Sequence, residues 1–152
     1  GCRFAIVVSR FNEHVTPGLL AGAREALAES EIAADDVTVV EVPGAFEIPV
    51  MALRLAESGG FDAVICLGCL IKGDTQHFEY IAAAASQGIM NVSTLTGLPI
   101  AFGVLTATTD AQAEERAAPG PGNKGREAAL AAIEMAVLFR GAGFGRADED
   151  ES

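Results

Sequence analysis

The sequence predicts an α/β fold, a three-layer sandwich in which helices cover both faces of a doubly wound, four-stranded parallel sheet. Two observations predict it. Short runs of branched apolar residues alternate with helical patterns along the chain, and those runs are apolar on both faces. Such strands are buried on both sides and joined by helical crossovers, which favours a flavodoxin-like arrangement. A length of 152 residues suits one such domain and is too short for two.

The strands are expected where branched apolar residues cluster. Four runs meet this description: residues 3–9, 37–42, 63–67 and 100–106. The first helix follows the first run, because Thr16 before Pro17 predicts an N-cap with proline at the first helical position. This helix should end near Ser30. Its inward face is marked by apolar residues four positions apart: Leu19, Ala23 and Leu27.

Two further helices are expected after the second and third strands. One covers residues 47–58 and stops at Gly59 and Gly60, which can adopt a left-handed conformation. The other covers residues 78–92. The residues expected to face inward are Val50, Leu53 and Ala56 or Glu57 in the former, and Ile81, Ala85, Ile89 and Val92 in the latter.

The last third of the chain should form two helices separated by a turn. Thr109 and Asp110 cap a short helix that ends near Ala118, where the Pro-Gly-Pro-Gly stretch at 119–122 interrupts it. The last helix covers residues 124–140, with three residues facing inward: Leu130, Ile133 and Val137. The domain therefore spans residues 1–141, and residues 142–152, with four consecutive acids, are expected to form a disordered tail.

Composition argues against several classes of protein. A net charge of −11 with ten Lys and Arg argues against a nucleic-acid partner. No apolar run is long enough to cross a membrane, and the first residues do not resemble a secretory signal, so we expect a cytoplasmic protein. Cys2, Cys66 and Cys69 do not suggest a disulfide framework. The Cys-x-x-Cys spacing is typical of metal or redox sites, but Cys66 lies inside an apolar run, which indicates a chance match.

Functional residues are expected in the loops after the strands, because ligands bind outside the carboxyl ends of parallel strands. These loops cover residues 10–13, 43–47, 68–77 and 106–110. Their aromatic, amide, carboxylate and imidazole groups suit a planar polar heterocycle together with a phosphate. In the longest loop, Gly73 lets the backbone approach an anion, and Asp74 and Thr75 can expose N–H groups at a helix start.

His77 has two interpretations. In the first turn of a helix, the positive end of the helix dipole disfavours the imidazolium, so a neutral ring can accept a proton from a substrate. Alternatively, His77 is a partly exposed residue that caps its own helix. The residues alone favour neither interpretation.

Six motifs follow one another along nearly the whole chain. They are Arg-Phe-Asn at 10–12, Pro-Gly-Ala-Phe-Glu-Ile-Pro at 43–49, the loop at 68–77, Phe-Gly-Val-Leu-Thr at 102–106, Glu-Arg-Ala at 115–117 and Gly-Asn-Lys-Gly at 122–125. Each alone is a weak match. Together, in order and in spacing, they make the chain resemble the lumazine synthase family, which implies the penultimate step of riboflavin biosynthesis.

The resemblance implies roles for individual residues. The pyrimidine ring would stack on Phe11, and His77 would move protons. The other substrate-binding residues it implies are Ala45, Phe46, Glu47, Cys69, Leu70, Ile71 and Phe102, and the phosphate-binding residues are Asp74, Thr75, Arg116 and Lys124. Phe102 and Arg116 would reach the site from an adjacent subunit. Without the resemblance, Phe11 could equally pack in a core, Glu47 could simply begin its helix, and Lys124 could be an ordinary surface residue.

The reaction implied is the condensation of 5-amino-6-(D-ribitylamino)uracil with 3,4-dihydroxy-2-butanone 4-phosphate to 6,7-dimethyl-8-ribityllumazine, with release of phosphate and water. It would pass through a Schiff base, loss of phosphate and ring closure, and it requires no metal or redox cofactor. The resemblance also implies a homo-oligomer, a pentamer or an icosahedral 60-mer, with riboflavin synthase as one candidate for a further partner.

The chain departs from the family pattern in two places. Lys72 stands where many relatives have an arginine, and Ala118-Pro119-Gly120-Pro121 lacks the usual lysine, which bears on phosphate binding and on contacts between pentamers. Two other classes of function stay open: a flavin-binding module that stores riboflavin, and a structural shell subunit without catalysis. The presence together of Phe11, His77 and Arg116 favours the enzyme.

Overall fold

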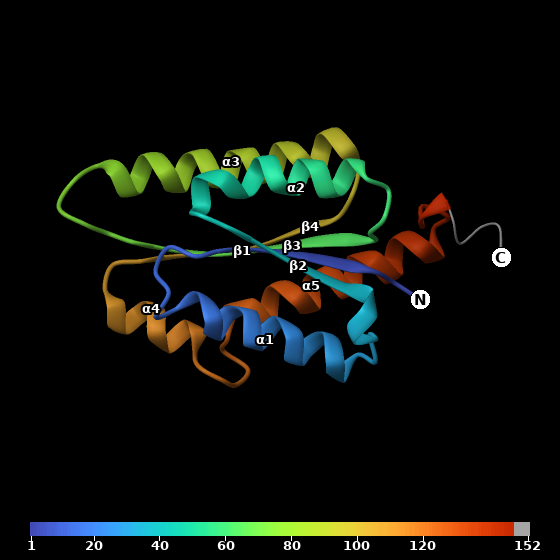
Figure 1. Cartoon of the computed structure of the whole chain (residues 1–152), viewed down its shortest axis with the longest axis horizontal. Coiled ribbons are helices and arrows are strands. Elements are labelled where there is room, and N and C mark those ends of the chain that lie inside the picture. Colours follow the sequence, from blue (N-terminus) through green and yellow to red (C-terminus); the bar gives the residue numbers. More distant parts are fainter. Residues whose placement is uncertain (148–152) are drawn as a thin grey trace.

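The computed structural model describes residues 1–147 and has three layers (Figure 1). The middle layer is one sheet of β1 (Phe4–Ser9), β2 (Val37–Val42), β3 (Ala63–Ile71) and β4 (Ile100–Ala107). The strand order is β2-β1-β3-β4, and every neighbouring pair is parallel. The predicted doubly wound sheet is therefore confirmed. β3 is longer than predicted because its pairing with β4 continues to Ile71 and Ala107.

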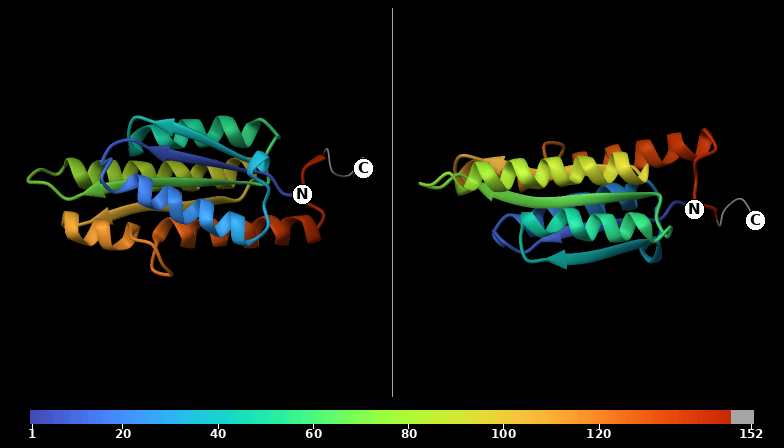
Figure 2. Two further views of the ribbon diagram at one scale, coloured as in Figure 1. Left: turned by 60° about the horizontal axis from the view of Figure 1, so that its bottom comes forward. Right: turned by 90° about the horizontal axis from the view of Figure 1, so that it is seen from above.

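Helices cover both faces of the sheet. On one face lie α2 (Ile48–Glu57) and α3 (His77–Thr96), and on the other lie α1 (Thr16–Glu29), α4 (Asp110–Ala117) and α5 (Lys124–Gly141) (Figures 1 and 2). Two 3₁₀ turns, η1 (Ala34–Asp36) and η2 (Ala45–Glu47), precede β2 and α2. Because all strands are parallel, their carboxyl ends meet at one edge of the sheet, on the left in Figure 1.

Each face of the sheet has its own core. Along β1, Phe4, Ile6 and Val8 pack towards α1 and α5, whereas Ala5 and Val7 pack towards α2 and α3. All five side chains are buried. A register slip of one residue would exchange the two sets, so this alternation fixes the pairing of the strand.

The inward face of α5 differs from the prediction. Ile133 is partly buried against the core, but Leu130 is exposed and Val137 is 60% exposed. The buried residues are small: Gly125, Ala128, Ala129, Ala132 and Ala136. A Cβ at Gly125 would collide with the backbone of Leu19 in α1. The helix therefore packs mainly through its small residues, and Leu130, Val137 and Leu138 stay exposed.

The predicted inward face of α2 is partly wrong. Val50 is exposed, whereas Ile48 and Ala52 are fully buried and Leu53 and Ala56 are partly buried. The helix is thus rotated so that its first residue, Ile48, enters the core. The predicted stop is confirmed, because Gly59 has a φ of 75° just after the helix.

The ends of two other helices test the predicted caps. The Thr109 side chain accepts a hydrogen bond from the Gln112 N–H at 3.2 Å, so the predicted cap of α4 is confirmed. The predicted cap at Thr16 is wrong, since Thr16 is buried within the first turn of α1. The carbonyl of Asn12 instead accepts from the N–H groups of Val15 and Thr16 at 2.9 and 3.2 Å.

The predicted inward face of α3 agrees with the structure. Ala85, Ile89 and Val92 are buried, and Ile81 is partly buried against the same core. The helix is longer than predicted and ends at Gly97, which has a φ of 73°. A glycine in this conformation satisfies the last carbonyl groups of a helix without steric strain.

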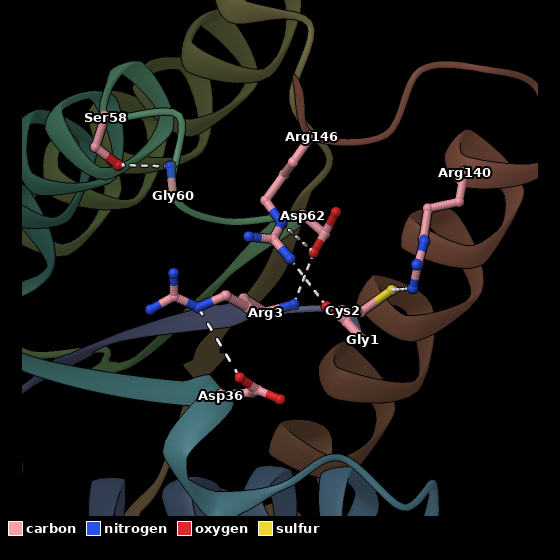
Figure 3. A network of polar contacts seen from close by, with 9 residues as sticks. All are labelled: Gly1, Cys2, Arg3, Asp36, Ser58, Gly60, Asp62, Arg140 and Arg146. Atoms are coloured by element: carbon pink, nitrogen blue, oxygen red, sulfur yellow. Dashed lines mark hydrogen bonds and ion pairs between the residues drawn. The ribbon is translucent and has the colours of Figure 1, made fainter. Parts of the chain in front are cut away.

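Hydrogen bonds and an ion pair connect the last described residues to the first ones (Figure 3). Arg146 Nε donates to Asp62 Oδ2 at 2.9 Å, and its guanidinium also donates to the Gly1 carbonyl at 2.9 Å. The same carboxylate oxygen accepts from the Arg3 N–H at 2.6 Å. Residues 142–147 belong to the segment expected to be a tail, and they contact the amino-terminal edge of the sheet through Arg146. Residues 148–152 lie outside the described residues.

Three features are absent from residues 1–147. No helix in this range is long and apolar enough to span a membrane. No group of three or more His, Cys, Asp or Glu residues in the same range is placed to hold a metal ion. Cys2, Cys66 and Cys69 are all buried and form no disulfide.

Candidate active site

The structure has two hollows towards the carboxyl ends of the strands. The aromatic hollow, about 500 Å³, opens between the loops after β1, β2 and β3 and the start of α3. It is lined by these predicted site residues: Phe11, Ala45, Phe46, Glu47, Leu70, Ile71, Thr75 and His77. The cationic hollow, about 440 Å³, lies between β4, α4 and α5. It is lined by three others: Phe102, Arg116 and Lys124.

Phe11 is held on a loop whose backbone is fixed. The Phe11 N–H donates to the Pro43 carbonyl at 3.0 Å, and Asn12 Nδ2 donates to the Cys69 carbonyl at 2.7 Å. These bonds join the loop after β1 to the ends of β2 and β3. Even so, Phe11 is 65% exposed. An exposed aromatic ring on a fixed loop indicates a binding surface rather than core packing.

Sequence reasoning assigned no role to Asn12. Its φ of 66° is in the left-handed region, which asparagine tolerates better than most residues. This conformation lets one residue end the strand, start α1 through its carbonyl and anchor β3 through its side chain. The signals in the sequence are an asparagine shortly after an apolar run and its place in the Arg-Phe-Asn motif at 10–12.

The 3₁₀ turn η2 sets how three residues meet a ligand. Ala45 is buried, whereas Phe46 is exposed, and both residues line the aromatic hollow. Glu47 is the N-cap residue of α2 and is half-buried. The positive end of the helix dipole stabilises a carboxylate there. The segment therefore offers an aromatic ring and a hydrogen-bond acceptor to the aromatic hollow.

The turn between β3 and α3 is open to an anion. Lys72 N–H donates to the Ala107 carbonyl at 2.9 Å, and Thr75 Oγ1 accepts from the His77 N–H at 3.3 Å. Apart from Gly73 and its two chain neighbours, no described residue has a heavy atom within 4 Å of the position that a Cβ on Gly73 would take. Thr75 and His77 line the aromatic hollow, while Asp74 is exposed just outside its lining.

Cys69 is buried in the core between the sheet and α1, α4 and α5, and it lines neither hollow. Burial raises the pKa of its thiol to about 11, with a further contribution from the carboxylate of Asp110. Burial alone raises the pKa of the Cys66 thiol to about 12. Such thiols stay protonated near neutral pH and are poor nucleophiles. Only the backbone of Cys69 is therefore suited to contact a substrate.

The cationic hollow combines two positive side chains with an aromatic ring. Arg116 is exposed near the end of α4, and Lys124 begins α5 with its Nζ 3.2 Å from Glu127 Oε2. Phe102 projects from the edge strand β4 and is 50% exposed. Glu127 also lines this hollow. An arginine and a lysine in one hollow suit a phosphate, which the guanidinium can bind through two parallel hydrogen bonds.

Within one chain the predicted residues are thus divided between two separate hollows. The stacking, ribityl and proton-transfer candidates belong to the aromatic hollow, and both long cations belong to the cationic one. A ligand that contacts both sets must therefore lie between the aromatic hollow of one chain and the cationic hollow of another, or bridge the two in one chain.

Comparisons with known proteins add to these observations. Residues 1–140 match the sequence model of a family described as 6,7-dimethyl-8-ribityllumazine synthase. A curated protein of that name from Syntrophus aciditrophicus (strain SB) is 54% identical over 140 residues, which cover 92% of this chain and 91% of the relative. A de novo designed Rossmann fold protein matches with a TM-score of 0.39 and 15% identity, covering 74% of this chain and 91% of that one. A likeness this weak carries no argument.

Proposed function

The chain belongs to the 6,7-dimethyl-8-ribityllumazine synthase family, and we propose that its two hollows are complementary halves of one active site. It is an enzyme of riboflavin biosynthesis that condenses 5-amino-6-(D-ribitylamino)uracil with 3,4-dihydroxy-2-butanone 4-phosphate. The products are 6,7-dimethyl-8-ribityllumazine, phosphate and water. Each hollow would supply residues for a different part of this reaction.

The aromatic hollow holds the ribitylaminouracil. Phe11 stacks on the pyrimidine, since its exposed ring lies on a fixed loop. Phe46, Glu47 and the backbone of Ala45 hold the ribityl chain. Main-chain groups of residues 69–71, at the carboxyl end of β3, bind the edge of the uracil. The volume of about 500 Å³ is in the range of small-molecule sites.

The phosphate of the second substrate binds between the open turn at Asp74 and Thr75 and the cations of a neighbouring subunit. Arg116 binds two phosphate oxygens through its guanidinium, and Lys124 supplies a second positive charge. The observation that carries this assignment is the division of the groups: one chain presents the ring-binding surface and the turn in one hollow, and the cations in another.

The enzyme is therefore proposed to be a pentamer with its active sites between subunits. Large apolar side chains on the outer surface of α5 support this, because a lone chain would leave Leu130, Val137 and Leu138 in water. An icosahedral 60-mer, contact with riboflavin synthase and a cytoplasmic location stay predictions.

His77 is assigned the proton transfers. The 5-amino nitrogen attacks the ketone carbon and water leaves, which gives a Schiff base. The neighbouring carbon then loses a proton as phosphate is expelled, and the resulting enol becomes a ketone. The ribityl-bearing nitrogen adds to this new carbonyl, and a second water leaves as the ring closes. His77 lines the aromatic hollow one turn from the phosphate-binding residues, so its imidazole can accept and return the protons of these steps. Holding both substrates in register supplies much of the remaining acceleration.

Mixed oligomers test the division of the site between subunits. His77→Ala disables the aromatic half and Arg116→Ala the cationic half, so each variant alone should be nearly inactive in lumazine formation. When the two are co-expressed in equal amounts, one subunit can supply His77 and its neighbour Arg116. Random assortment in a ring should then restore about one quarter of the wild-type activity per site.

The control is a double variant, His77→Ala with Arg116→Ala in one chain, co-expressed with wild-type chain at the same ratio. It also leaves about one quarter of interfaces intact, because both neighbours must then be wild type. Absence of activity in the mixture of single variants, with activity in this control, would mean that each site lies within one subunit. Wild-type protein that forms no product would refute the assignment of both hollows.

A further inference from the structure

Asn123 lies at the junction of α1, α4 and α5 and is 2% exposed. Its Nδ2 is within hydrogen-bond distance of three carbonyl oxygens, those of Gly18 at 3.0 Å, Ala117 at 2.9 Å and Ala118 at 3.1 Å. Its Oδ1 accepts from the Arg126 N–H at 3.0 Å and caps α5. One buried amide thus connects three helices.

The junction leaves no space for another side chain. A Cβ at Gly22 would collide with Asn123 Oδ1, and one at Gly18 would collide with the Ala117 carbonyl. Interiors packed this closely transmit small displacements to neighbouring groups. The position of Asn123 therefore fixes the end of α4 relative to the start of α5.

Both cations of the cationic hollow lie on the backbone that Asn123 holds. Arg116 immediately precedes Ala117, whose carbonyl accepts from Asn123, and Lys124 immediately follows Asn123. Between them runs the turn at 118–122, where Gly120 has a φ of 121°. α4 has only eight residues, so its end needs an anchor of this kind.

We propose that Asn123 is a positioning residue for phosphate binding, which sets the spacing between Arg116 and Lys124 without touching the substrate. This inference rests on the proposed phosphate role of these two cations. An apolar residue could fill the same space, but it would leave the Ala117 and Ala118 carbonyls without their donor and the two cations without a fixed separation.

Asn123→Ser separates the two functions of the side chain. A serine retains the helix cap on α5, because its hydroxyl can accept from the Arg126 N–H, but it is too short to reach the carbonyls at the end of α4. We expect the KM for 3,4-dihydroxy-2-butanone 4-phosphate to rise about tenfold, as for the weakening of one charge-assisted hydrogen bond. The KM for the ribitylaminouracil should change less than about twofold, because residues of the other hollow bind it.

A stability control distinguishes positioning from a general loss of structure. Leu27→Ala removes a buried side chain near the far end of α1 and should lower the melting temperature. It should leave the ratio of the two KM values at the wild-type value. A parallel rise of both KM values in Asn123→Ser, or no rise in either, would overturn the proposal. If Asn123→Ser does not assemble, the Gly18→Ala variant takes its place in every measurement. A Cβ at Gly18 would collide with the Ala117 carbonyl and so displace the same turn.

A double-variant cycle tests whether Asn123 acts through Arg116. If it does, Asn123→Ser should add little to the KM of Arg116→Ala, whereas additive effects would contradict the coupling. Inhibition by inorganic phosphate gives a second readout, and its inhibition constant should rise together with the KM. If Arg116→Ala itself leaves the KM for the phosphate substrate unchanged, the proposed phosphate site and this inference are both wrong. If Arg116→Ala raises that KM and Asn123→Ser does not, only this inference is wrong.

Discussion

At the scale of single residues, exposed aromatic rings mark the proposed binding surface, whereas polar side chains that bond to the backbone belong to the supporting fold. Phe11 and Phe46 are large, apolar and exposed beside the aromatic hollow. Asn12 and Asn123 are polar, yet both side chains donate hydrogen bonds to backbone carbonyls inside the fold. The aromatic rings are available to ligands, and the asparagines hold in place the loops that carry functional groups.

Phe11→Ala should weaken binding of the ribitylaminouracil without destabilising the fold. The loss of one stacked ring corresponds to a rise in KM of about tenfold or more. The melting temperature should change little, because most of the ring is already in water. Steady-state kinetics and calorimetry measure both effects. Leu95→Ala, at an exposed position on α3, is a matched control, and an equal change in its KM would contradict the role of Phe11.

The buried thiols predict that the free energy of unfolding decreases at alkaline pH. Because burial raises the pKa of Cys66 and Cys69 above the ordinary value of 9.0, the folded state holds these protons more tightly than the unfolded state. The stability linked to them is complete below about pH 9 and is lost as the pH rises towards 11 and 12. In the native protein at pH 8, both thiols should react with Ellman's reagent at least about 100-fold more slowly than after unfolding. Rapid native labelling of either thiol would contradict the described burial.

At the scale of helices and strands, the sequence predicts where each element lies better than how it is rotated. Alternating apolar runs located every strand, and Gly59 and Thr109 marked helix ends. The inward face of α5 was predicted from its largest apolar residues, but the close approach of α1 selects alanines instead. Which side of a helix is buried depends on the distance to its neighbour, and a single sequence does not contain that distance.

The outer surface of α5 predicts how the assembly can be broken. Val137→Glu with Leu138→Glu should yield smaller particles, because two charges would be buried at the proposed subunit contact. The variant should keep its helical circular dichroism and lose activity, since each site would lack its second half. Sedimentation velocity measures the particle size. Ala21→Glu, at an exposed position on α1, is the control, and a pentamer of the α5 variant would contradict the proposed contact.

At the scale of the whole molecule, the topology could be predicted from the sequence, and so could the edge of the sheet at which the aromatic hollow lies. Parallel strands bring the loops after β1, β2 and β3 together, and those three loops line the aromatic hollow as expected. The fourth loop, residues 106–110, was expected at the same place but is absent from this lining, and its Thr106 lines the cationic hollow. The separate position of Arg116 and Lys124 follows from the packing of α4 and α5 against β4. That packing depends on a buried asparagine and several glycines, which in the sequence look like ordinary turn residues.

The ion pair at the amino-terminal edge predicts a large loss of stability. The Arg146 and Asp62 side chains are 10% and 3% exposed, so replacing Asp62 removes the carboxylate that a buried guanidinium contacts, at a cost of about 3 kcal/mol. Asp62→Ala should lower the melting temperature more than a replacement of Arg146, because the backbone N–H of Arg3 also donates to this carboxylate. The half-exposed pair of Arg3 and Asp36, 4.0 Å apart, should contribute less than about 1 kcal/mol. Equal decreases in melting temperature for Asp62→Ala and Asp36→Ala would contradict the conclusion that burial makes the Arg146–Asp62 pair the more important one.

The bond between Arg146 and the Gly1 carbonyl makes the described chain almost a closed ring, because it joins groups 145 positions apart in sequence. A short peptide linker could therefore connect these ends with little conformational entropy to lose. New termini could then be opened at an exposed loop, and the order of the strands along the chain would change while their order in the sheet stayed the same. A partner fused beside Gly1 would lie at the edge of the sheet opposite to the loops after β1, β2 and β3, whose residues line the aromatic hollow (Figure 1).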